Sequence, residues 1–189
     1  MIDSQNLIEI PDLSGVPNLK QLILRHCTRL YMIRASLGDL KQLIQLDLNG
    51  CKCLKSLPHK INLESLEIID LGGCSRLKKF LEIKGNMSRL SELCLSESVL
   101  KVLSLLLEHL TSLTKLDLRE CKNLSSLPNA ICSLMSLKNS QFIWLFKTWQ
   151  IARELGKCWR TRCVKCEWNW YKRATFIHHS LKKSQKPIF

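Results

Sequence analysis

The 189-residue chain lacks an uninterrupted run of 18 apolar residues, so no segment is predicted to span a membrane. Residues 1–12 lack a basic stretch followed by an apolar one, so no secretion signal is predicted there. The seven glycines never form the G-x-x-x-x-G-K-[ST] loop that cradles nucleotide phosphates, and no cofactor is predicted. The five histidines are scattered, and no Ser/His/Asp or Cys/His arrangement can be located around them. The sequence therefore does not predict an enzyme.

A leucine-spaced phrase recurs along most of the chain. The pattern L-x-x-L-x-L-x-x-C, with isoleucine for the second leucine in one copy, begins at residues 19, 43, 66, 90 and 113, in steps of 24, 23, 24 and 23 residues. This period is the signature of leucine-rich repeats, in which x-Leu-x-Leu-x forms a short strand with one buried face. Successive strands stack in parallel. We therefore predict an α/β fold, a right-handed leucine-rich-repeat solenoid (horseshoe) with a parallel sheet on its concave face.

The repeats are expected to occupy residues 1–137, and residues 138–189 to form an extension. Residues 1–18 align with the second half of a repeat, so we expect the chain to begin inside a solenoid, as a truncated product would. The extension holds 12 Lys/Arg against 2 acidic residues, whereas residues 1–137 hold 17 against 14. Apolar residues at helical spacing predict an amphipathic helix at about 140–157, with irregular structure beyond it.

Five residues occupy the closing position of the repeated phrase, and four of them are cysteines. We expect each side chain to turn inward after its strand, where a thiol can pack and hydrogen-bond to nearby loop backbone. This columnar placement favours reduced, structural thiols in a cytosolic protein over disulfides or redox chemistry. The predicted structural ladder consists of Cys27, Cys51, Cys74, Ser98 and Cys121.

The basic extension suggests two other hypotheses. Cys158, Cys163, Cys166, His178 and His179 offer zinc-type ligands, although their spacing fits no standard structural zinc pattern. All five tryptophans lie among lysines and arginines in the same segment, a composition that suits nucleic acid or an anionic membrane surface. No known nucleic-acid-binding module is recognisable, so this stays an alternative to protein interaction.

Residues 68–103 begin IIDLGGCSRLKKFLEIKGNM, and residues 122–138 read KNLSSLPNAICSLMSLK. These stretches resemble the leucine-rich-repeat region of plant intracellular TIR-type nucleotide-binding disease resistance proteins, with departures at Leu81 and at 98–100, and the likeness covers residues 1 to about 138. The resemblance implies a non-catalytic module of plant defence that contacts pathogen effectors or other receptor domains or subunits. It also implies a cytoplasmic location, with the nucleus as a second place of action. Nucleotide binding is not implied, because this sequence holds neither the phosphate loop nor a TIR-like domain.

In the family's strand geometry, the x positions of x-L-x-L-x face the concave surface. Asp47, Asp70 and Asp117 would then form one exposed acidic stripe, with basic residues beside it. The resemblance implies a surface that contacts a partner protein; the alternative is that exposed strand positions are polar for solubility alone. The predicted partner-binding residues are Arg25, Asp47, Asn49, Asp70, Glu92, Lys115, Asp117 and Arg119.

Overall fold

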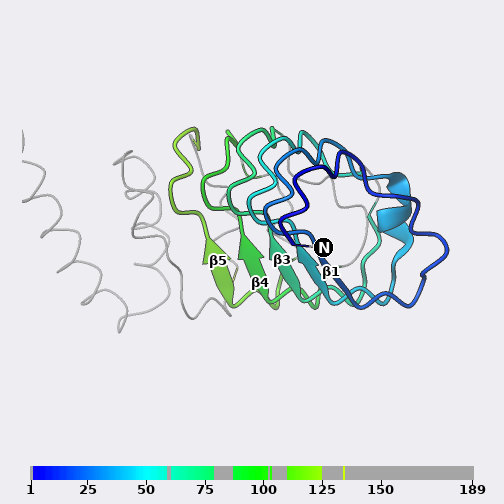
Figure 1. Cartoon of the computed structure of the whole chain (residues 1–189). Coiled ribbons are helices and arrows are strands. Elements are labelled where there is room, and N and C mark those ends of the chain that lie inside the picture. The colour runs from blue at the N-terminus through cyan, green and yellow to red at the C-terminus, as the bar shows by residue number, and fades with distance from the viewer. Residues whose placement is uncertain are drawn as a thin grey trace, which may run out of the picture. The chain divides into compact units, whose positions relative to one another are not determined.

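The computed structural model describes residues 2–58, 61–78, 87–101, 103, 110–124 and 134, and all structural statements below concern these residues. They contain a single parallel sheet whose strands follow one another in chain order (Figure 1). A short 3-10 helix, η1 (Ala35–Asp39), lies between the first two strands. The strands are β1 (Gln21–Ile23), β2 (Gln45–Asp47), β3 (Ile68–Asp70), β4 (Glu92–Cys94) and β5 (Lys115–Asp117).

Equivalent residues of successive repeats lie opposite each other in the sheet. The central residue of each strand lies opposite the central residue of the next, from Leu22 through Leu46, Ile69 and Leu93 to Leu116. The flanking leucines are buried with it, so that in the second repeat Leu43, Leu46 and Leu48 are all fully buried. Each repeat therefore places one layer of leucines on the layer of its neighbour, and the predicted leucine-rich-repeat solenoid is confirmed.

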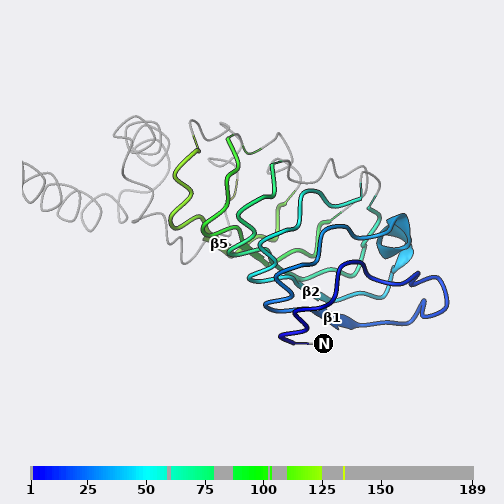
Figure 2. The ribbon, with the colours of Figure 1, turned by 45° about the horizontal axis from the view of Figure 1, so that its top comes forward.

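Where the structure describes it, the remainder of a repeat carries the chain back towards the next strand, as stacked turns in Figure 2. In the second repeat, these return residues bury Leu54, Leu57, Ile61 and Leu63. Their side chains close the core on the side away from the sheet, so a repeat of only 23 or 24 residues has a continuous apolar interior.

Residues 2–18 pack on the return segment of the following repeat. The backbone N–H of Tyr31 donates to the carbonyl of Ile8 at 2.8 Å, and Glu9 and Met32 form an isolated parallel bridge. Ile10 and Leu13 are buried, at 3% and 8% exposure. These contacts give the N-terminal segment the hydrogen-bonding pattern of a return segment, although no strand precedes it among the described residues.

Just before the closing position, each repeat has one residue with positive φ. These φ values lie between 55° and 74°, in the left-handed region that glycine favours. Most of these residues donate their backbone N–H to a carbonyl of the next repeat, as His26 does to Asn49 and Gly50 to Gly72, both at 2.7 Å. We call this set the turn column: Asp3, His26, Gly50, Gly73, Glu97 and Glu120.

Several predictions fall outside the described residues. They are the basic extension 138–189, its amphipathic helix at about 140–157, and the candidate zinc ligands between Cys158 and His179. Within the part of the chain that is described, no helix is long and apolar enough to cross a membrane. The same part contains no group of three or more metal-ligating side chains suited to hold an ion.

Candidate protein-interaction surface

Three cysteines of the structural ladder bond to the residue that directly follows the strand of the preceding repeat. The thiol of Cys51 donates to the carbonyl oxygen of Leu24 at 3.1 Å, and that of Cys74 donates to Leu48 at 3.3 Å. Cys121 likewise reaches the carbonyl of Leu95 at 3.1 Å. These thiols are buried, and each adds a second hydrogen bond to a carbonyl that already accepts a backbone N–H from its own repeat.

The remaining two ladder residues differ in detail. The Cys27 thiol is buried and lies 3.8 Å from the carbonyl oxygen of Arg25 in its own repeat. Ser98 is buried as well, and its hydroxyl lies 3.3 Å from the thiol of Cys121. Serine is therefore accommodated at this position as a small buried polar group with a hydrogen-bonding neighbour.

Burial favours the protonated form of three ladder thiols. It raises the pKa of Cys51 and of Cys74 to about 12, and it also raises the pKa of Cys121. A thiolate is the form that attacks disulfides and binds metals, and this environment disfavours it. These three thiols are therefore suited to a structural role.

The last residue of three strands is an aspartate whose carboxylate accepts the backbone N–H two residues further on. Asp47 accepts from Asn49 at 3.2 Å, Asp70 from Gly72 at 2.9 Å, and Asp117 from Arg119 at 3.0 Å. An aspartate that bonds to its own backbone in this way stabilises a turn. These aspartates therefore help the chain to leave the strand at the same point in each repeat.

Two of these aspartates are also covered by an arginine. The Nε of Arg25 lies 2.6 Å from Oδ2 of Asp47, and Arg119 donates to Asp117 through Nε at 3.0 Å and Nη2 at 2.7 Å. Burial alone would raise the pKa of Asp117, but the hydrogen bonds and charge of Arg119 hold that pKa below its usual range. Arg25 and Arg119 remain half-exposed above the carboxylates.

The exposed acidic stripe expected from the sequence is therefore not what the structure shows. Asp47 and Asp117 are 0% and 5% exposed, because an arginine lies over each carboxylate and the turn folds around it. At these two repeats the surface presents an arginine in place of an aspartate. Asp70 is half-buried, and its carboxylate accepts two neutral donors, the backbone N–H of Gly72 and the Asn49 amide at 3.2 Å.

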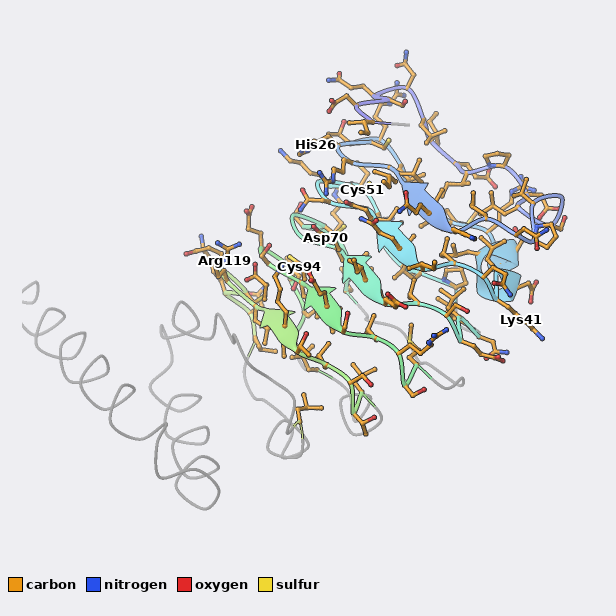
Figure 3. The ribbon with its side chains drawn as sticks, turned by 90° about the horizontal axis from the view of Figure 1, so that it is seen from below. His26, Lys41, Cys51, Asp70, Cys94 and Arg119 are labelled. Carbon is orange, nitrogen blue, oxygen red and sulfur yellow. The ribbon has the colours of Figure 1, made fainter. Side chains whose placement is uncertain are left out.

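The outward positions of the strands add a second layer of polar side chains. Lys115 in β5 donates to Glu92 in β4 at 2.9 Å, and both side chains are about half exposed. Figure 3 shows Asp70, Cys94 and Arg119 in a row at the carboxyl ends of the strands, far from Lys41 at the opposite ends. We call the following set the strand face: Gln21, Arg25, Gln45, Asn49, Ile68, Asp70, Glu92, Cys94, Lys115 and Arg119.

Cys94, a member of this face, and Gly72, which lies against it, carry no obvious signal in the sequence. Cys94 follows the strand leucine in the fourth repeat, at the place that aspartate takes in three others, and its thiol lies 3.4 Å from the Ser96 hydroxyl. Burial raises the pKa of Cys94 to about 11. Gly72 is packed so closely that a β-carbon there would lie 2.8 Å from Ser96 Oγ and 2.9 Å from Asn49 Nδ2. A larger residue at position 72 would therefore displace Ser96 or Asn49.

The chain is similar in sequence to plant disease resistance proteins. It is 37% identical to TMV resistance protein N of Nicotiana glutinosa over 154 residues, which are 81% of this chain and 13% of that protein. It is 36% identical to SUPPRESSOR OF npr1-1, CONSTITUTIVE 1 of Arabidopsis thaliana over 72% of this chain and 9% of that protein. The chain is homologous to the repeat region of plant disease resistance proteins. The predicted resemblance to the TIR-type receptors is thereby confirmed.

Solved structures support the same fold. A leucine-rich-repeat protein of Leptospira interrogans matches with a TM-score of 0.56 and 28% identity, over 71% of this chain and 33% of that chain. The leucine-rich-repeat domain of the type III effector XopL matches with a TM-score of 0.51 and 30% identity, over 71% of this chain and 56% of that chain. No protein-family model matches the sequence. The chain spans about a tenth of the length of the plant relatives reported above.

Proposed function

We propose that the chain acts as a non-catalytic, cytoplasmic protein-interaction module in pathogen recognition and signalling by a plant immune receptor. The homology to disease resistance proteins supports this assignment, and so do the buried, protonated thiols, which offer no reactive group. Its partner would be a pathogen effector or another domain or subunit of the receptor.

The observation that carries the proposal is the state of the charged side chains on the strand face. Arg25, Arg119 and the Glu92–Lys115 pair are each between 41% and 50% exposed, yet ion pairs already hold them in place. A side chain that is ordered before binding loses less conformational entropy when a partner docks. The face therefore combines accessible charge with preorganisation, which suits specific protein recognition.

The test exchanges charges on this face without breaking their ion pair. In the double variant Glu92→Lys and Lys115→Glu, the pair can re-form with its polarity reversed, so the melting temperature should stay within about 2 °C of the native value. The matched control reverses the exposed Glu9–Arg34 pair, which lies outside the strand face. Both variants are made in the full 189-residue chain.

Each chain is fused to a biotin ligase and expressed in infected and uninfected leaves, and the labelled proteins are quantified. We expect the native chain and the Glu9–Arg34 control to label the same set of proteins. Labelling of this set by the strand-face variant should be lower by at least about tenfold. Equal labelling by all three chains would overturn the proposal that this face is the docking surface.

A further inference from the structure

Three repeats end their strand in aspartate, and their surroundings differ in one respect. Two residues can lie over each carboxylate: the residue two positions on in the same repeat, and its counterpart in the preceding repeat. For Asp47 the preceding repeat supplies Arg25, and for Asp117 the same repeat supplies Arg119. One of the two flanking positions is thus an arginine in each of these cases.

Around Asp70, both flanking positions are neutral. The preceding repeat supplies Asn49, whose Nδ2 lies 3.2 Å from Oδ1 and 3.4 Å from Oδ2, and the same repeat supplies Gly72. No lysine or arginine in the described part of the chain makes an ion pair with this carboxylate. Asp70 is also half-exposed, whereas Asp47 and Asp117 are buried.

A partly exposed carboxylate that is held only by neutral donors can accept further hydrogen bonds. Its backbone bond to Gly72 fixes its direction, and the arginines over Asp47 and Asp117 show that a guanidinium fits this turn geometry. Guanidinium and carboxylate groups form short, directional, charge-assisted bonds. Asp70 lies in β3, between the repeats of Arg25 and Arg119, so a partner residue that docks there would meet a carboxylate with no arginine of the described residues over it.

We propose that Asp70 anchors an arginine of the partner protein, so that the partner completes the pattern which Arg25 and Arg119 form within this chain. The inference rests on the proposed function, because it names the chemistry that the strand face recognises. Asp70 is then the specificity-determining residue of the face, and the surface of the partner that meets it is basic.

Two variants test this proposal from opposite directions. Asp70→Asn keeps an oxygen for the Gly72 N–H and removes the charge. Asn49→Arg places an arginine in the position relative to Asp70 that Arg25 has relative to Asp47. The introduced guanidinium would then pair with the Asp70 carboxylate within the chain. The backbone N–H of residue 49, which bonds to Asp47, is retained in both variants. Asp39→Asn, which removes an exposed carboxylate outside the strand face, is the matched control.

The first measurement uses a defined probe. The 15N-labelled full chain is titrated with acetyl-arginine amide and, separately, with the citrulline analogue, and the amide signal of Gly72 is followed by NMR. We expect the arginine probe to bind at least about fivefold more tightly to the native chain and to Asp39→Asn than to either test variant. The citrulline probe should bind all four chains equally weakly. Equal binding of arginine to native chain and Asp70→Asn would overturn the proposal.

The second measurement separates this inference from the proposed function. The biotin-labelling experiment is repeated with Asp70→Asn and Asn49→Arg, both of which should lose the proteins that the Glu92–Lys115 reversal loses. If the reversal loses those proteins and the two Asp70 variants keep them, the strand face is a docking surface and the arginine anchor is wrong. If no protein depends on the strand face, the proposed function fails, and the NMR titration still decides whether Asp70 selects a guanidinium.

Discussion

The Nε of Arg25, in the turn after β1, lies 2.6 Å from Oδ2 of Asp47 at the end of β2, and the Asp47 side chain is 1% exposed. The pair joins two repeats through a charge that has no contact with bulk water on its acidic side. A buried carboxylate is costly without a compensating cation or donors, so the arginine contributes to stability and is more than a surface charge.

Replacing Arg25 by alanine should therefore lower the free energy of unfolding more than the loss of a fully exposed ion pair does, although half of the arginine is solvated and Asp47 keeps its backbone donor. The exposed Arg34–Glu9 pair supplies the control: Arg34→Ala should cost less than about 0.5 kcal/mol. Urea unfolding followed by circular dichroism measures both. Equal losses would show that burial of Asp47 does not matter.

The Asp117–Arg119 pair predicts a specific acid sensitivity. The pKa of Asp117 in the native state is below its usual range, so the ionised group stabilises the fold above the unfolded-state pKa of about 3.9. That contribution is lost as the pH falls through the lower native pKa. The stability difference between the native chain and Asp117→Asn should be largest near about pH 6 and shrink below about pH 4. Thermal unfolding at a series of pH values measures it, and a difference independent of pH would contradict the assignment.

The ladder thiols should resist modification while the chain is folded. Because the pKa of Cys51 and Cys74 is raised to about 12, both should react with iodoacetamide at neutral pH only as fast as the chain opens. Cys53, close in sequence but half-exposed, is the internal comparison and should be labelled first. Mass spectrometry of tryptic peptides over time gives the order, and rapid labelling of Cys51 would refute it.

The same raised pKa values have an alkaline consequence. The thiols of Cys51 and Cys74 contribute their full stabilisation below the unfolded-state thiol pKa of about 8.5. This contribution is lost as the pH rises towards about 12, because thiols in the unfolded chain lose their protons at lower pH than thiols in the folded chain. Cys51→Ala should therefore lower stability by about 1–3 kcal/mol at neutral pH, through a lost side chain and the loss of one of the two hydrogen bonds to the Leu24 carbonyl, which keeps the Cys27 N–H at 3.4 Å. This deficit should diminish in alkali. Denaturant unfolding of both chains at rising pH tests the trend, and a deficit that grows would contradict it.

The turn column predicts unequal effects of alanine at equivalent positions. Gly50 has φ of 74°, and an added β-carbon would lie 2.4 Å from Nδ1 of His26, so Gly50→Ala should cost about 2 kcal/mol or more. Glu97, with φ of 58°, already bears a side chain in the same conformation, and Glu97→Ala should change stability by less than about 0.5 kcal/mol. Denaturant unfolding compares them, and similar costs would show that the His26 contact is unimportant.

The repeated phrase located the strands because hydrophobic spacing and strand pairing express the same period. Each strand is centred on the second leucine of a phrase, or on Ile69 in the third repeat, and the register follows without exception from Leu22 to Leu116. A repeat that buries leucines on one side has few other ways to stack. Fold prediction succeeded at this level for that reason.

The sequence was less informative about the surface, because simple alternation treats every second strand residue as exposed. Asp47 stands at an outward position but ends its strand, where the chain turns and an arginine one repeat earlier reaches over it. The covering residue is 22 positions away, so no local pattern indicates it. The turn column was missed because glycine marks it in two repeats, whereas His26, Glu97 and Glu120 do not.

Each turn-column N–H that bonds between repeats donates to the repeat that follows it, and this regularity affects how repeats can be gained or lost in evolution. Each bond runs from one coil to the coil after it, at nearly equal lengths from His26 to Arg119. Insertion or deletion of one whole unit, cut at equivalent turns, would leave every remaining donor facing an equivalent acceptor. Unequal recombination could therefore lengthen or shorten the array without disturbing its interior, while exchanging which charges are displayed outside.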